Sequence, residues 1–144
     1  MMWGCFCWNG VGYACKIDGR MDAQLYCSIL DDDLQKSIEL YGLERDNDPK
    51  HTSKLAKQWF QDHDIDVLTW PPQSPDLNPI EHLWGILKRR LAAYEVAPKG
   101  ITELWERVEA EWEKIDASVC QKLMESMPRR MEAVIRAKGG YIKY

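Results

Sequence analysis

The sequence lacks any apolar run close to the roughly 20 residues that a membrane-spanning helix needs. Its start, M-M-W-G-C-F-C-W-N-G, also lacks the basic region and long apolar core of a secretory signal peptide. Positive charge is scarce, because 19 Lys and Arg residues face 23 Asp and Glu residues and leave a net charge of −4. These absences predict a protein with no membrane partner that is not secreted. The acidic charge balance is also a poor one for a free-standing nucleic-acid binder, so any nucleic-acid role would need a local basic patch.

The cysteines do not form a disulfide framework. They are odd in number and irregularly spaced, at positions 5, 7, 15, 27 and 120. Without a secretory signal, this pattern indicates reduced thiols in a nuclear or cytoplasmic protein. Cys5 and Cys7 would share one face of a strand, but no second pair of matching spacing completes a zinc site, so free thiols are favoured.

The 144 residues are 45% hydrophobic and 29% charged, which suits one globular domain with one core. Residues 2–8 and 11–17 are apolar runs on either side of Asn9-Gly10, a pattern typical of a β-hairpin. A further short apolar run at 67–70, ended by two prolines, predicts another strand.

Helical periodicity fills most of the remaining sequence. We expect a helix over 23–41 capped by Asp22, and another from about 53 to 62 with four inward residues: Leu55, Ala56, Trp59 and Phe60. Further helices begin near Asn78, at Thr102 and near Ser118, the last with a break near Pro128. Strands that alternate with helices early, followed by helices alone, predict the α/β class.

Residues 70–91 form the most informative stretch. Asn78 is a good N-cap, and Pro79 falls at the first helical position, where a proline is tolerated. Glu81, as the third helical residue, can reach back to the cap in a capping box. An apolar stripe follows at helical period and predicts a helix to about residue 96: Ile80, Leu83, Trp84, Leu87 and Leu91.

Two motifs carry a family resemblance. D-N-D-P-K-H-T-S at 46–53 and W-P-P-Q-S-P-D-L-N-P-I-E-H-L-W at 70–84 closely resemble the catalytic domain of Tc/mariner superfamily transposases. W-G-C-F-C-W-N-G-V-G at 3–12 and W-E-R-V-E-A-E-W at 105–112 extend the resemblance over essentially the whole chain. The resemblance implies a ribonuclease H-like fold, a mixed sheet flanked by helices with a helical C-terminal end, and an Asp, Asp, Glu catalytic triad.

By motif position, the second Asp of the triad corresponds to Asp46 and the Glu to Glu81, with 34 residues between them. Taken alone, an Asp in a turn and a Glu in a first helical turn have structural interpretations as caps. The resemblance instead implies that both are catalytic metal ligands. Two Mg²⁺ or Mn²⁺ ions would serve phosphodiester cleavage and strand transfer, because such hard cations take carboxylate oxygens.

The resemblance also implies transposon-end DNA as a partner and a transposase homo-oligomer. Basic residues near the two acids can meet DNA phosphates: Lys50, His51, Lys88, Arg89 and Arg90. For the last three, a solvated helix face explains the charges equally well. His51 and His82 flank the two acids and can orient substrate, or they can be ordinary surface histidines.

The sequence departs from the family pattern in two ways. The family places its first Asp on a strand upstream of the W-G-C-F segment, and no Asp precedes Asp18 here. The approach to Asp46 is L-Y-G-L-E-R instead of an apolar strand, so Asp48 is an alternative in the same turn. We therefore expect an incomplete sheet, with 1–97 as a partial catalytic domain and 98–144 as its helical extension.

These departures leave several functions open. The resemblance implies that the chain is, by descent, a DNA cut-and-paste transposase domain, and we expect this isolated chain to be inactive. The alternative is a non-enzymatic interaction module that binds full-length transposase or another protein through apolar surface at Trp3, Phe6 and Trp8. A remnant without a selected role is the third interpretation.

Overall fold

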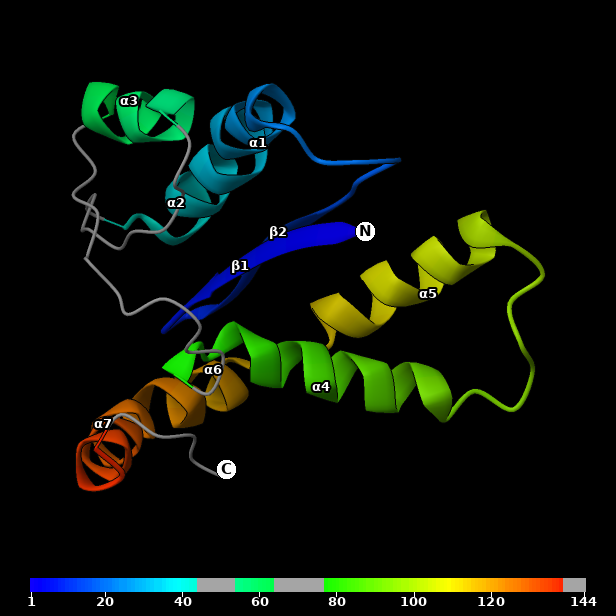
Figure 1. Ribbon diagram of the computed structural model, residues 1–144. Helices are drawn as coiled ribbons and strands as arrows, with labels where there is room; N and C mark the ends of the chain where they lie inside the picture. The colour runs from blue at the N-terminus through cyan, green and yellow to red at the C-terminus, as the bar shows by residue number, and fades with distance from the viewer. Residues whose placement is uncertain (44–53, 64–76, 139–144) are drawn as a thin grey trace. The chain divides into compact units, whose positions relative to one another are not determined.

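The structure is a computed structural model that describes residues 1–43, 54–63 and 77–138 (Figure 1). Contacts divide the chain into two compact units. The first consists of Met1–Cys5 and Gly12–Pro72, and the second of Phe6–Val11 and Gln73–Tyr144. The predicted strand at 67–70 lies outside the described residues, as does the segment that contains Asp46.

The chain begins with the predicted β-hairpin. Strands β1 (Met2–Cys7) and β2 (Gly10–Lys16) form a two-stranded sheet. Met1 and Ile17 exchange two backbone hydrogen bonds of 2.8 and 3.1 Å at its open end, which is the pattern of an antiparallel pair. The turn residues are Trp8 and Asn9, one position earlier than predicted. Gly10 opens β2 with φ 144°, a conformation that favours glycine.

One long helical run follows the hairpin, as predicted over 23–41. It consists of α1 (Ala23–Ile29), a π-helical segment η1 (Leu30–Leu34) and α2 (Gln35–Tyr41). The Asp22 carboxylate accepts a hydrogen bond from the Leu25 amide at 2.8 Å, which confirms the predicted cap. Gly42 ends the run with φ 57°, in the left-handed conformation common after helices.

The run packs closely on the hairpin at Gly12. A Cβ at this position would lie 2.6 Å from both Cys5 Sγ and Ser37 Oγ, so only glycine fits without a shift. The Tyr13 amide donates a hydrogen bond of 2.9 Å to Ser37 Oγ. At Gly12 the hairpin and α2 are therefore in direct contact.

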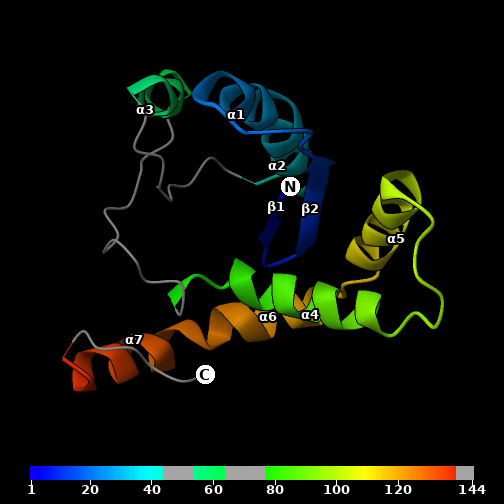
Figure 2. The ribbon, with the colours of Figure 1, turned by 45° about the vertical axis from the view of Figure 1, so that its right-hand side comes forward.

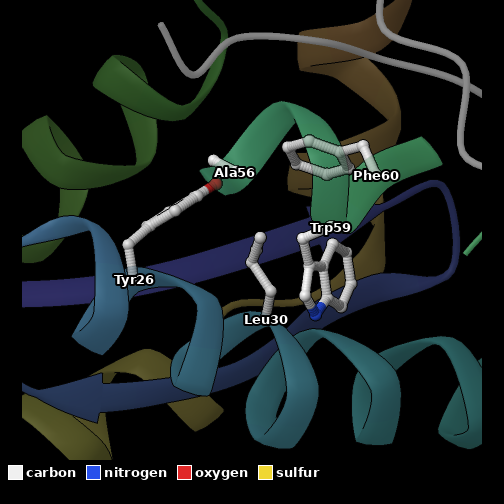
Figure 3. Packing of buried hydrophobic residues seen from close by; sticks show 5 residues of the cluster. All are labelled: Tyr26, Leu30, Ala56, Trp59 and Phe60. Carbon is white, nitrogen blue, oxygen red and sulfur yellow. The ribbon is translucent and has the colours of Figure 1, made fainter. Parts of the chain in front are cut away.

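The core of the first unit lies between the long run and α3 (Lys54–Asp62). Figure 3 shows Tyr26 and Leu30 facing three side chains of α3: Ala56, Trp59 and Phe60. These three positions share one helix face, which confirms their predicted orientation. The prediction for Leu55 is wrong, because its side chain is 48% exposed. Leu55 precedes Ala56 by one position, a rotation of about 100° that turns it away from this face.

The described helices of the second unit are α4 (Ile80–Ala92), α5 (Ile101–Glu113), α6 (Ala117–Glu125) and α7 (Met127–Arg136). Helix α4 packs against α5, with Leu83 and Leu87 buried on α4 and Val108 and Trp112 on α5. The rings of Trp84 and Trp112 stack with centroids 5.1 Å apart. The predicted apolar stripe of α4 therefore packs on α5 of the same chain.

Two boundaries of α4 differ from the prediction. The helix begins at Ile80 with Pro79 as the capping residue, so Glu81 is the second helical residue instead of the third. It ends at Ala92 and not near residue 96, because the amides of Ala93 and Tyr94 turn back to the carbonyls of Arg90 and Leu91.

Helices α6 and α7 form the helical C-terminal end. The Asp116 carboxylate caps α6 by accepting a 2.8 Å hydrogen bond from the Ser118 amide. The helix is interrupted at Ser126 and the chain continues as α7, with Pro128 in its first turn. Figure 2 shows α7 following directly on α6. The predicted break near Pro128 is confirmed. Within the described ranges, no helix is long and apolar enough to cross a membrane.

Candidate functional site

Glu81 is exposed in the first turn of α4. Its carboxylate forms no hydrogen bond or ion pair with any residue that the structure describes, so the capping-box alternative is not realised there. A negative charge at this position is favoured by the positive end of the helix dipole. Glu81 is thus a carboxylate in the first turn of a helix, where no described residue binds it.

The other predicted ligand and two predicted DNA contacts are not described: Asp46, Lys50 and His51 all lie in the segment 44–53. No group of three His, Cys, Asp or Glu side chains that could hold a metal ion occurs in the described part of the chain. This part of the chain therefore contributes one predicted metal ligand, Glu81.

The exposed face of α4 carries positively charged side chains on the C-terminal side of Glu81. Lys88 lies seven residues after Glu81, and Arg89 lies seven after His82, so each pair shares a helix face. Gly85 lies between them without a side chain. A Cβ on Gly85 would be 3.6 Å from Arg89 Nη1, so this guanidinium reaches back along the helix towards the Glu81 end. Lys88 and Arg89 are both exposed, as a phosphate contact requires.

Arg90 lies on a different side of α4. Its Nη1 donates a hydrogen bond of 3.0 Å to the Glu111 carbonyl oxygen, and lies 3.9 Å from Glu111 Oε2. The position is seven residues after Leu83 and three after Leu87, so it belongs to the buried stripe. Its predicted contact with DNA stays a prediction, but this arginine already joins α4 to α5.

Glu111 is a buried carboxylate with several donors around it. Tyr94 Oη donates to it at 3.0 Å and Lys114 Nζ at 2.8 Å. The Lys114 hydrogen bond is the main reason that the pKa of Glu111 lies below its usual range; Tyr94 and the charge of Arg90 act in the same direction, while burial opposes them. The hydrogen bond from Tyr94 also joins the residues that follow α4 to α5.

This cluster predicts an acid-dependent loss of stability. A carboxyl group whose folded pKa lies below its unfolded value stabilises the fold above the unfolded pKa of about 4.3, and this stabilisation disappears as the pH falls through the folded pKa. Glu111→Gln should therefore lower the melting temperature at pH 7, and the difference from wild type should shrink at about pH 3. Thermal melts at the two pH values test this. Glu113→Gln, at an exposed neighbouring position, is the control, and an equal difference at both pH values would contradict the prediction.

A contact that the sequence did not indicate lies beside Glu81. Arg130, on α7, places Nη1 3.3 Å from Nδ1 of His82, across 48 residues of sequence. Burial is the main cause that lowers the pKa of His82, followed by the charges of Arg130 and Arg89; Glu81 opposes them. Arg129 and Arg130 are adjacent basic residues in the sequence, and no local pattern indicates that His82 is the partner of one of them.

Comparisons of the sequence with known proteins agree on one family. A family model described as DDE superfamily endonuclease matches residues 1–104. The transposable element Tcb1 transposase of Caenorhabditis briggsae is 42% identical over 149 residues, which cover 100% of this chain and 54% of that protein. The transposable element Tc1 transposase of Caenorhabditis elegans has the same identity and coverage. The chain spans about half the length of these curated relatives.

Solved structures show the fold. The structure of the Mos1 transposase catalytic domain with raltegravir and Mg matches with a TM-score of 0.83, over 99% of this chain and 76% of that chain, at 18% identity. The Mos1 transposase paired-end complex with the left transposon end matches with a TM-score of 0.84, over 99% of this chain and 44% of that one, also at 18% identity. These matches confirm the predicted α/β, ribonuclease H-like fold.

Proposed function

We propose a function from one premise: the chain belongs to the DDE superfamily endonuclease family, and by descent it is catalytic-domain sequence of a Tc/mariner-type transposase. The proposed function is to supply Asp46 and Glu81 to a divalent-metal site for phosphodiester cleavage and strand transfer in cut-and-paste transposition. In a complete catalytic domain of this family, these two acids would act together with a third carboxylate ligand, the first Asp of the triad.

The observation that supports this proposal most directly is the position and exposure of the Glu81 carboxylate. It stands at the motif position of the family's Glu, is exposed at the mouth of α4, and has no partner among the described residues. An uncommitted carboxylate is the ligand type that Mg²⁺ and Mn²⁺ prefer. The related Mos1 catalytic domain is described with Mg, which supports the choice of metal. When bound, such ions activate an oxygen nucleophile and stabilise the leaving oxygen.

We propose DNA as the substrate, since the Mos1 paired-end complex is described with a transposon end. Lys88 and Arg89 would bind phosphates along the exposed face of α4, with Lys50 and His51 contributing from the segment 44–53. Arg90 would serve instead as a link to α5. A paired assembly of transposase chains and a nuclear location follow from the same proposal. Residues 98–144 would extend the catalytic domain of 1–97, consistent with the packing of α5 on α4.

A second candidate function is favoured by exposed aromatic side chains of the hairpin. Trp8 is 46% exposed at its turn and Tyr13 45% exposed on β2, while Trp3 packs against the Tyr26–Trp59 cluster. Such a surface suits an interaction module that binds another transposase chain. Light scattering of this chain mixed with a Tc/mariner transposase that carries the whole family domain tests the alternative. A mixture that scatters as two separate species would exclude it.

The experiment that tests the metal site is a thermal melt with and without MnCl₂. A ligand that binds only the folded state stabilises it, by about 2.7 kcal/mol at a concentration 100 times its dissociation constant. Mn²⁺ should therefore raise the melting temperature of the wild-type chain and leave that of Glu81→Gln unchanged. Glu106→Gln, at an exposed position on α5, should respond like wild type. An equal rise in Glu81→Gln would place the metal elsewhere and overturn the proposal.

A further inference from the structure

Arg130 is buried to an unusual degree for an arginine. It is 2% exposed on α7, and a buried guanidinium is retained in a fold only where polar groups compensate for its lost hydration. One of these groups is His82 Nδ1, 3.3 Å from Arg130 Nη1. His82 directly follows the proposed metal ligand Glu81, and it is in contact with Arg130, 48 residues later in the sequence.

The chemistry of this contact fixes the position of the ring proton. A guanidinium carries only donors, so Nδ1 of His82 must accept, and the proton of the neutral ring lies on Nε2. Nε2 has no hydrogen-bond partner among the described residues, and His82 is partly exposed. As far as the described residues are concerned, the contact therefore leaves an N–H donor next to Glu81 in the sequence.

The surroundings of this donor suit a phosphate. Arg89 lies on the same face of α4 and its charge acts on His82. Resting on the proposed function, we propose that His82 donates its Nε2–H to a phosphate oxygen of the DNA strand held at Glu81. Arg130 is the positioning residue that fixes this orientation and tautomer of the ring.

The tautomer can be measured in the full chain labelled with ¹⁵N-histidine. A long-range ¹H–¹⁵N spectrum at about pH 8, above the ordinary histidine pKa near 6.5, distinguishes a proton on Nε2 from one on Nδ1. We expect His82 in the Nε2–H form. His63 is an internal control, because its Nδ1 lies 2.8 Å from the Trp59 carbonyl, which only accepts, and so must carry the proton. His82→Gln assigns the signal.

Two variants test the cause. Arg130→Met removes the donors and keeps a long apolar side chain, so the His82 signal should change to a mixture of both tautomers while that of His63 stays the same. An Nδ1–H form of His82 in the wild-type chain would overturn the inference without any variant. An unchanged tautomer in a folded Arg130→Met chain would overturn the role of Arg130.

Binding of a fluorescent DNA duplex at low salt tests the donor. We expect His82→Ala to weaken binding about tenfold, since a hydrogen bond to a charged group is lost, and His82→Gln, which keeps an N–H donor, to stay within about twofold of wild type. Arg130→Met should weaken binding, and should add little further loss in the His82→Ala background. Equal affinity of wild type and His82→Ala would overturn the donor role.

The same samples separate this inference from the metal site. A Mn²⁺ effect that depends on Glu81, together with DNA binding that is indifferent to His82, would refute the inference and leave the proposed function standing. The absence of any Mn²⁺ effect in wild type would refute the proposed function, whatever the tautomer of His82.

Discussion

Leu83→Ala is expected to lower the free energy of unfolding by about 3 kcal/mol, within the range of about 2–5 kcal/mol for buried leucines. Leu83 is 0% exposed and lies on the buried stripe of α4, two residues after Glu81. The loss combines the transfer of the removed methyl and methylene groups with a cavity that the surrounding side chains fill only in part. Urea unfolding followed by circular dichroism measures it.

The matched control is Leu40→Ala, the same change at a side chain that is 57% exposed on α2. Its effect should stay within about 0.5 kcal/mol, because little apolar surface is returned to water. If the two variants lost the same stability, Leu83 would not be a core residue, and the prediction would be wrong. The turn that carries Glu81 is anchored by Leu83, so the loss of Leu83 should also weaken the Mn²⁺ effect on the melting temperature.

Most of the described elements could be predicted from the sequence because their signals are local. The cap of Asp22, the left-handed Gly42 after α2 and the break before Pro128 each depend on neighbouring residues alone. The stripe of α4 is equally local, since positions three and four apart must share a helix face. In these segments the conformational preference of the chain and the tertiary packing agree.

The features that the sequence did not indicate are contacts between residues far apart in the chain. Helix α4 ends early where Tyr94 bonds to Glu111, 17 residues away. The predicted DNA contact of Arg90 stays a prediction, but its place on the buried stripe could also have indicated its hydrogen bond to Glu111 on α5. The Arg130–His82 contact joins residues 48 positions apart, so no local signal indicates that the two are partners.

The candidate site was identified from long sequence motifs more than from the physical properties of its individual residues. An Asp in a turn and a Glu in a first helical turn are common as caps, and only the long motifs favoured catalysis. The structure adds one physical fact, that the Glu81 carboxylate does not cap its own helix. For Asp46, outside the described residues, the assignment still depends on the motif.

Trp59→Ala is the second large effect, with an expected loss of about 4 kcal/mol, within the range of about 3–5 kcal/mol for buried aromatic residues. Trp59 is 7% exposed and joins α3 to the long helical run (Figure 3). Its ring meets Phe60 edge-on with centroids 5.3 Å apart and stacks on His63 at 4.0 Å, while its Nε1 donates a hydrogen bond to Asp31. The change therefore removes volume, two ring contacts and one hydrogen bond together.

Trp59→Phe separates these contributions, because it keeps an aromatic ring and removes the N–H donor to Asp31. Its loss should be clearly smaller than that of Trp59→Ala, whereas Leu55→Ala, at the exposed side of the same helix, should change stability little. Urea unfolding followed by circular dichroism compares the three. Helix α3 begins eight residues after Asp46, so its attachment to α1 is the described anchor nearest to that acid on its C-terminal side. Equal stability of Trp59→Ala and Leu55→Ala would show that the Trp59 contacts do not hold α3 against the long helical run. Trp59 would then not stabilise the chain that follows Asp46.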